Sequence, residues 1–191
     1  MPQYRSLEKL VAFVLRVQIA DEGAQQPRTD QRCPAMRGLV GACSLITVGQ
    51  GEAANGLVVT TGISLSAEPP MILACVNRAS SCWPLLQREG VFGWQALGAA
   101  HQPVAERFSG KGGLQGPARY AGTEWVTTDT GVRLLADAPL AFACAVDDMI
   151  DRGTHSILIG RVLQITTRPD RGALMYWDGQ YRVLRNQSGL V

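Results

Sequence analysis

Short apolar and β-branched runs, separated by turn-forming residues, dominate the chain from residue 37 onward. Runs rich in Val, Ile and Leu and bounded by Gly, Pro, Asn or Asp are typical of strands. The pattern predicts strands at residues 39–48, 57–61, 71–76, 91–97, 140–150 and 156–167. In 140–150, Phe142, Cys144, Val146 and Ile150 share one parity and therefore one face. Residues 151–153 are a predicted hairpin turn between the last two runs.

Helical signals are fewer. Residues 81–89 begin with serine, carry Pro84 in the first turn and are followed by Gly90, and 103–108 is a second short helix. Apolar residues at helical spacing predict an amphipathic helix at 7–19, and the polar stretch 21–34 is a predicted linker. Many short strands with few helices favour a closed barrel over a doubly wound sheet. A Rossmann fold is excluded, because no Gly-x-Gly-x-x-Gly follows a strand.

Composition narrows the function classes. The 191 residues fit one domain, with 46% hydrophobic and 18% charged residues and a net charge of +2. Since no basic run occurs, we expect neither a nucleic-acid nor a membrane partner. Five cysteines without a Cys-x-x-Cys pair, together with only two histidines, predict no metal site and a reducing cytoplasm. His101, in a polar stretch, is a predicted surface residue.

Two segments are distinctive in their order and spacing. The first is NGLVVTTGISLS at 55–66, followed by Glu68-Pro69-Pro70, and the second is THSILIGRV at 154–162, entered after Gly153. Together they resemble the short-chain flavin reductase family, the NAD(P)H:flavin oxidoreductases that supply reduced flavin to partner monooxygenases. FGWQAL at 92–97 and the closing LMYWDGQYR at 174–182 extend the resemblance to residues 36–184.

The resemblance implies a flavin site along the first segment. The family pattern is Gly-Met-Thr-Ala-Asn/Thr-Ser-Phe-x-Ser-Val-Ser, which here has Val58 in place of threonine and Gly62 in place of an apolar, often aromatic residue. An extended strand with small hydroxyl residues can supply hydrogen bonds and an apolar wall to a flavin ring. The implied ring-binding residues are Val58, Val59, Thr60, Thr61 and Ser64, with Gln95 in the place of a family asparagine. By themselves, the threonines are equally typical of a solvent-facing strand.

Residues 77–84, NRASSCWP, correspond to the family's Asn-Arg-x-Ser-x-Thr segment, which holds the flavin phosphate. The implied contacts are Asn77, Arg78, Ser80 and Ser81, while Cys82 replaces the threonine. A cation and the free N–H groups of a helix start suit an anion. An ordinary serine N-cap is the alternative.

His155 lies where the family has Gly-Asp-His-Thr-Ile, with Thr154 in place of the Asp. The resemblance implies that this imidazole lines the nicotinamide side of the flavin, and we treat His155 as the candidate catalytic residue. A neutral imidazole can steer a carboxamide or a phosphate. A structural hydrogen bond at the start of the strand is the alternative.

The resemblance predicts a mainly β protein, a split antiparallel β-barrel with a few flanking α-helices. The barrel domain is expected at residues 35–188, after an N-terminal helix and linker at 1–34. The implied function is reduction of FMN or FAD by NADH or NADPH, in a cytoplasmic homodimer with a flavin-dependent monooxygenase partner. Two alternatives stay open: a flavoprotein that reduces a bound acceptor such as a corrinoid, quinone or metal complex, and a non-catalytic flavin- or haem-binding relative.

Overall fold

A seven-stranded antiparallel sheet organises the computed structural model, which describes residues 36–168 and 172–185. The predicted helix at 7–19 and linker at 21–34 lie outside the described residues. From residue 38 on, the chain forms one compact unit. Along the sheet the strands are β3 (Asn55–Val59), β2 (Ser44–Val48), β6 (Val91–Ala96), β9 (Leu140–Arg152), β10 (His155–Thr167), β5 (Pro70–Asn77) and β4 (Ile63–Ala67).

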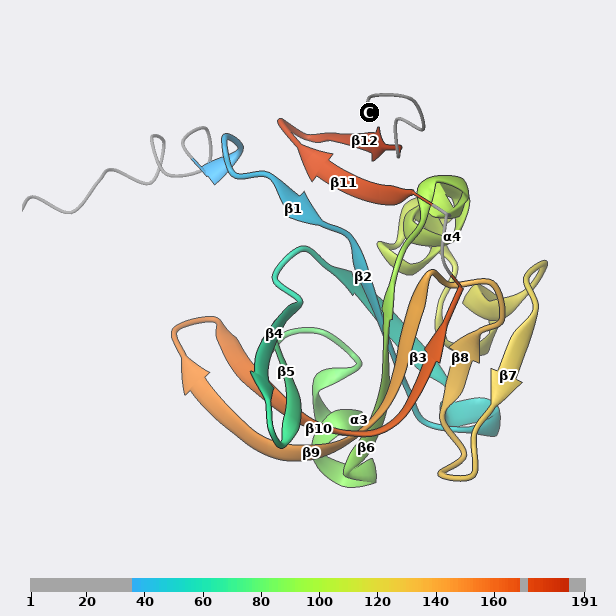
Figure 1. Cartoon of the computed structure of the whole chain (residues 1–191). Helices are drawn as coiled ribbons and strands as arrows, with labels where there is room; N and C mark the ends of the chain where they lie inside the picture. Colours follow the sequence, from blue (N-terminus) through green and yellow to red (C-terminus); the bar gives the residue numbers. More distant parts are fainter. Residues whose placement is uncertain (1–35, 169–171, 186–191) are drawn as a thin grey trace, which may run out of the picture. The chain divides into compact units, whose positions relative to one another are not determined.

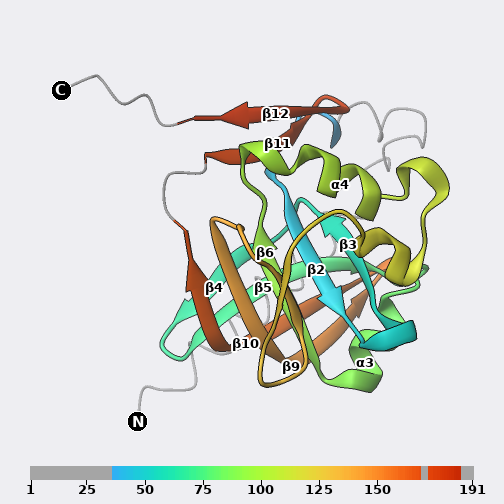
Figure 2. The same ribbon diagram turned by 90° about the vertical axis from the view of Figure 1, so that its right-hand side faces the viewer.

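The sheet curls, so that β3 at one end contacts β5 near the other (Figure 1, Figure 2). Register shifts on β10 at Ile159/Gly160 and Val162/Gln164 bend the long β9–β10 pair. At Gly160 the backbone passes so close to β6 that a Cβ would lie 2.4 Å from Phe92 Cζ. The predicted split antiparallel barrel is therefore confirmed.

Smaller elements flank this sheet. A three-stranded sheet joins β1 (Gly41–Ala42), β11 (Ala173–Trp177) and β12 (Gln180–Leu184), and a ribbon pairs β7 (Trp125–Thr127) with β8 (Arg133–Leu135). The two described α-helices are α3 (Trp83–Glu89) and α4 (Gln102–Phe108). Short 3-10 turns occur at Gly51–Ala53, Ala99–His101, Lys111–Gly113 and Gly116–Tyr120. None of the helices in the described part of the chain is long and apolar enough to cross a membrane.

Two hydrophobic cores lie on opposite sides of the central strands. β2 is buried along its whole length, with Leu45 in one core and Ile46 in the other. The first part of β9 also contributes to both cores, because Ala141 packs in the first and Cys144 in the second. Near the start of the strand, the face opposite to Phe142 and Cys144 is therefore buried as well, which the shared parity in 140–150 did not indicate.

Local predictions need three corrections. The first helix begins at Trp83 rather than at residue 81, and the hairpin turn is Gly153–Thr154, since Asp151 and Arg152 still pair with β10. His101 is 5% exposed rather than a surface residue. Its Nδ1 accepts the Gly98 N–H at 2.9 Å and its Nε2 lies 3.1 Å from Asp137 Oδ1, so the ring caps a loop inside the fold.

Candidate functional site

A cleft of about 370 Å³ opens where the end of β3 meets β5 and the start of β10. Its lining includes six residues predicted from the sequence, namely Val58, Val59, Thr60, Thr61, Asn77 and His155. Leu57, Cys75 and Tyr176 complete it. We call this the His155 cleft. The structure thus brings together both of the distinctive sequence segments.

Strand register explains why these side chains meet. β5 and β10 pair antiparallel, with His155 opposite Asn77 and Ile157 opposite Cys75. Their neighbours Val76 and Ser156 are fully buried, so the alternation of side chains turns His155, Asn77 and Cys75 away from the core. Residues distant in sequence therefore share one outward face of the sheet.

Thr61 shapes the cleft through its hydroxyl. Its Oγ1 accepts the Cys75 N–H at 2.9 Å and lies 3.4 Å from the Cys75 carbonyl oxygen, to which it donates. This pair of bonds fastens the turn of residues 60–62 to β5. Thr60 is exposed and keeps its place in the cleft lining.

His155 lies at the rim and is exposed. Its Nδ1 is 2.9 Å from the Thr154 hydroxyl, so Thr154 holds one ring nitrogen at the position where the family pattern has an aspartate. The Arg78 N–H donates to the Thr154 carbonyl at 3.0 Å and ties the turn to the end of β5. The second ring nitrogen, Nε2, has no acceptor or donor among the described residues and is available to a ligand.

Arg78, Ser80 and Ser81 lie beside the cleft and do not line it. The Arg78 guanidinium forms an ion pair with Asp151 at 3.3 Å and stacks over the Trp83 ring at 5.7 Å. Ser80 Oγ accepts the Cys82 N–H at 3.2 Å, and Ser81 Oγ accepts from Asn55 Nδ2 at 2.9 Å. These residues form an ordered rim, with the Arg78 charge partly committed to a carboxylate.

Gln95 is a core residue and not a ligand contact. Its side chain is fully buried, its Nε2 donates to Thr47 Oγ1 at 3.0 Å, and its Oε1 accepts the Leu135 N–H at 2.8 Å. The amide links β2, β6 and β8, which corrects its predicted flavin contact. Ser64, on the edge strand β4, is exposed and outside the cleft lining.

Cys82 is also a core residue. Its thiol is completely buried, and this burial raises its pKa to about 11. The thiol therefore does not reach the surface, where the threonine of the family pattern would offer a hydroxyl to the phosphate. Throughout residues 36–168 and 172–185, no group of three or more His, Cys, Asp or Glu side chains is placed to hold a metal ion.

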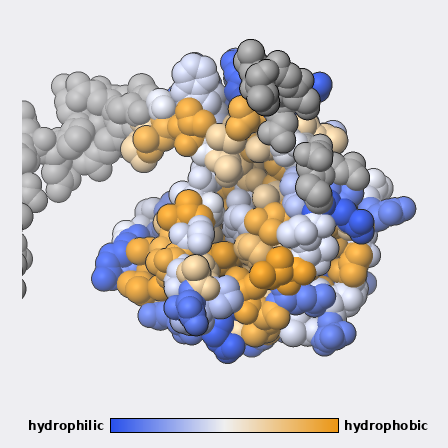
Figure 3. All heavy atoms as spheres, viewed as in Figure 1, coloured by the Kyte–Doolittle hydropathy of each residue, from blue (hydrophilic) through white to orange (hydrophobic). Residues whose placement is uncertain are grey.

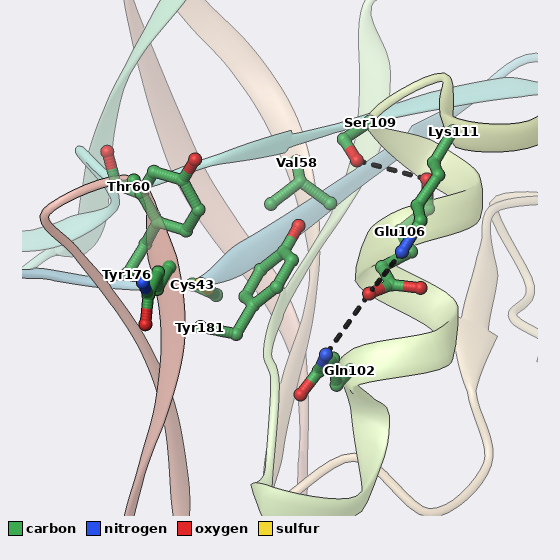
Figure 4. A pocket seen from close by; sticks show the side chains of 11 residues that line it. Cys43, Val58, Thr60, Gln102, Glu106, Ser109, Lys111, Tyr176 and Tyr181 are labelled. Carbon is green, nitrogen blue, oxygen red and sulfur yellow. Dashed lines mark hydrogen bonds and ion pairs between the residues drawn. The ribbon is translucent and has the colours of Figure 1, made fainter.

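A second cavity, of about 580 Å³, adjoins the first between α4 and the β11–β12 hairpin (Figure 4). We call it the hairpin lobe. It shares Val58, Thr60 and Tyr176 with the His155 cleft. Tyr176 and Tyr181 meet edge to face, with ring centroids 5.2 Å apart. The sequence analysis missed this lobe, and the only signal for it was the tyrosine pair in the closing hairpin.

The α4 side of the hairpin lobe is charged. Glu106 accepts from Gln102 Nε2 at 3.1 Å and from Lys111 Nζ at 2.9 Å. These hydrogen bonds lower the pKa of the Glu106 carboxyl and keep it ionised. The lobe therefore combines two aromatic rings with an ion pair, a lining suited to a polar, partly aromatic ligand.

The fold and the two adjoining cavities define a flavin reductase-like split barrel, and comparison with known proteins agrees. The family model described as "Flavin reductase like domain" matches residues 36–185. The chain belongs to this family.

Individual relatives share this description. The chain is 33% identical, over 95% of its length and 99% of the other, to FMN reductase (NADH) RutF of Agrobacterium fabrum. BorF, the flavin reductase component of a bacterial two-component tryptophan halogenase, is 28% identical and superposes with a TM-score of 0.76 over 84% of this chain and 100% of BorF. Nitrilotriacetate monooxygenase component B of Mycobacterium thermoresistibile is 25% identical, with a TM-score of 0.74 over 85% and 90% of the two chains.

Proposed function

We propose that this protein is a flavin reductase that transfers a hydride from NADH or NADPH to FMN or FAD. The observation that carries the proposal is the His155 cleft, in which residues 58–61, Asn77 and His155 line one concave surface. The relative from Agrobacterium fabrum is named as an NADH-dependent FMN reductase, which supports FMN and NADH as the first ligands to test.

The cleft fits a flavin on physical grounds. Val58 and Val59 offer an apolar wall. The backbone N–H groups of residues 60–62 donate to no other described residue, so they are available to the carbonyl-rich edge of the ring. An apolar wall beside convergent polar groups is the usual composition of a cofactor site.

Bound flavin would supply the chemistry, since its ring accepts a hydride from a nicotinamide. The protein's task is positioning. Reacting atoms must be held within about 3–3.5 Å of each other, in aligned orientations. Thr61 fixes the turn against Cys75, and His155 lies across the cleft, where its free Nε2 would orient the nicotinamide. Tyr176, shared by both cavities, would exclude water from the reacting face.

We place the flavin phosphate at the rim formed by Asn77, Arg78, Ser80 and Ser81. Asn77 lines the cleft, and Arg78 supplies the positive charge next to it. Because Asp151 already shares this guanidinium, the phosphate would compete for it rather than meet a free cation. The part of NADH or NADPH beyond the nicotinamide would enter the hairpin lobe, where Tyr176 and Tyr181 offer ring stacking and Lys111 offers a positive charge.

We further propose a homodimer that forms over the outer face of β4, β5 and β10. Register places Ile63 beside Leu73 and Leu73 beside Ile159, in one apolar row across the three strands. Ile63 is 58% exposed. Figure 3 shows apolar side chains gathered over this part of the molecule. The same face of β5 and β10 continues through Ile157 and its register partner Cys75, which lines the His155 cleft, so a second copy would help to close the site.

Partner and compartment follow from chemistry and analogy. BorF and component B are named as parts of two-component systems, with a halogenase and a monooxygenase, and we propose a flavin-dependent oxygenase of this kind as the consumer of reduced flavin. The four cysteines in the described residues are free thiols, which supports a reducing cytoplasm.

Anaerobic oxidation of NADH and NADPH with added FMN, with added FAD and without flavin tests the function. We expect turnover only when free flavin is added. Turnover with a tightly bound flavin and an added acceptor would favour the bound-acceptor oxidoreductase. Flavin binding without any nicotinamide oxidation would contradict the proposal and favour a non-catalytic binding protein.

A further inference from the structure

The indole N–H of Trp94 is a buried donor that has no acceptor in the described part of the chain. Trp94 is 7% exposed on β6, opposite Ile46 of β2. Its ring stacks on Phe142 with centroids 5.3 Å apart. Nearly all buried N–H groups in folded proteins are hydrogen-bonded, because an unpaired one is costly. An unpaired donor in a rigid setting therefore needs an explanation.

The unpaired N–H faces the underside of the turn of residues 60–62. A Cβ built on Gly62 would lie 2.4 Å from Trp94 Nε1 and 2.8 Å from Ser44 Oγ. Any side chain at residue 62 would collide with the polar edge of the indole. Gly62 and Trp94 are thus a matched pair, in which the missing side chain lets the turn rest directly on the ring. The other face of this turn carries Thr60 and Thr61 of the His155 cleft.

We infer that Trp94 is a positioning residue of the proposed flavin site, whose N–H donates to a backbone carbonyl of the 60–62 turn when flavin is bound. The inference rests on the proposed function. Trp94 would act on the cofactor only through the turn, because Gly62 lies against its N–H.

Peptide geometry provides the link. In a trans peptide the N–H and C=O groups point in opposite directions. The N–H groups of residues 60–62 lack partners among the described residues, as the indole N–H does. A ligand that draws one of these N–H groups outward turns the carbonyl of the same peptide inward. The unpaired Trp94 N–H lies on the inward side. The N–H of such a peptide would then bind the ligand while its carbonyl accepts from the Trp94 indole.

The indole N–H resonances of the whole chain test this directly. In protein labelled with ¹⁵N at the indole nitrogen, Trp94→Phe identifies the Trp94 signal. Saturating FMN should move that signal downfield and slow its exchange with solvent. The Trp125 signal should stay in place, because its N–H already donates to the Tyr120 carbonyl at 2.9 Å, away from the cleft.

Binding of FMN is followed in the same samples by quenching of flavin fluorescence. If FMN binds and the Trp94 signal keeps its position and exchange rate, the inference is wrong while the proposed function stands. If FMN does not bind, the proposed function fails and takes the inference with it. These two failures are therefore distinct.

A matched pair of variants adds a second measurement. Trp94→Phe removes the donor and should weaken FMN about three- to tenfold, the equivalent of one net hydrogen bond. Trp125→Phe makes the same exchange in the other core and should leave FMN affinity unchanged. Equal affinities of both folded variants for FMN would overturn the inference.

Discussion

The hydroxyl of Thr61 is bonded to both backbone groups of Cys75, at 2.9 Å to the N–H and 3.4 Å to the carbonyl oxygen. Because β4 follows this turn and pairs with β5, the turn is tied to β5 both by the Thr61 hydroxyl and by the strand that follows it. The cleft wall on the β3 side is thus set by a single side chain whose hydroxyl is already used inside the protein.

Thr61→Val should weaken FMN binding, since valine keeps the shape of threonine and loses both hydrogen bonds. We expect an effect of about 1 kcal/mol, or roughly fivefold in Kd. Thr61→Ser keeps the hydroxyl and should bind FMN nearly as well as the native chain. Fluorescence titration gives the Kd of FMN for the native chain and both variants. Equal Kd values for the valine and serine variants would show that the hydrogen bonds between Thr61 and Cys75 do not support the site.

Arg78→Ala should weaken FMN more than riboflavin, because only FMN carries a phosphate. The expected loss is about 1 to 1.5 kcal/mol, at or below the lower limit for a charged hydrogen bond, since the guanidinium is partly exposed and shared with Asp151. Arg88→Ala is the matched control: this exposed arginine on α3 pairs with its neighbour Glu89. Titration with both flavins decides the matter, and equal weakening of FMN and riboflavin would move the phosphate elsewhere, for instance toward Lys111.

His155→Ala should raise KM for NADH or slow flavin reduction by up to about tenfold, the equivalent of one net hydrogen bond to the nicotinamide, while FMN affinity stays close to native. The side chain is exposed, so the free energy of unfolding should change by no more than about 0.5 kcal/mol. Stopped-flow reduction at limiting and saturating NADH separates nicotinamide binding from hydride transfer. Native kinetics in a destabilised variant would instead assign His155 a structural role in the turn.

Stability should fall at alkaline pH because of buried thiols. Burial raises the pKa of Cys43 and Cys82 to about 11 and of Cys144 to about 12, from an ordinary value of 9.0. A group with a raised pKa in the folded state stabilises fully below the unfolded pKa and loses that contribution as pH rises toward the folded one. Urea unfolding between pH 8 and about pH 11 should therefore show a decline. Cys144→Ala should make the decline of the free energy of unfolding with pH less steep. An identical slope in this variant would show that the buried Cys144 thiol does not contribute to the decline.

Ile63→Lys should shift a dimer toward monomer in light scattering coupled to gel filtration. It places a charge in the apolar row on β4, β5 and β10. Val126→Lys is the control, since Val126 is 53% exposed on β7, in a separate sheet. A dimer that survives the first change and dissociates with the second would relocate the interface.

Long apolar runs predicted the main strands well, because β2 and β6 are largely buried, β5, β9 and β10 each bury a row of side chains, and turn residues bound them. The three-residue strands β7 and β8 were missed. They are held by hydrogen bonds in the turn between them, such as the one from the Thr128 N–H to the Val132 carbonyl. Such bonds produce no periodic pattern of hydrophobic residues in the sequence. β4 was missed as a separate strand because most of its side chains are exposed and its pairing with β5 is its main support.

The candidate site was partly predictable for the same reason. Residues 58–61, 77 and 155 sit at strand ends whose spacing along the chain is visible. The predicted flavin contact of Gln95 was wrong because both faces of β6 are covered, so a polar side chain on this strand points into the core on either face. Arg78 was identifiable as a charge, but its partner Asp151 comes from a distant strand. The hairpin lobe depends on α4 and β11–β12, which meet only in the folded chain.

Val58, Thr60 and Tyr176 line both cavities and separate the His155 cleft from the hairpin lobe. In the proposed function, flavin and the dinucleotide would contact these three residues from opposite sides, so binding of one ligand would be linked to binding of the other. Linkage of this kind is reciprocal: whatever factor flavin exerts on dinucleotide affinity, the dinucleotide must return to flavin. Changes at Gln102 or Lys111, which line the hairpin lobe alone, would then act mainly on dinucleotide affinity. Changes at the three shared residues would alter both affinities together.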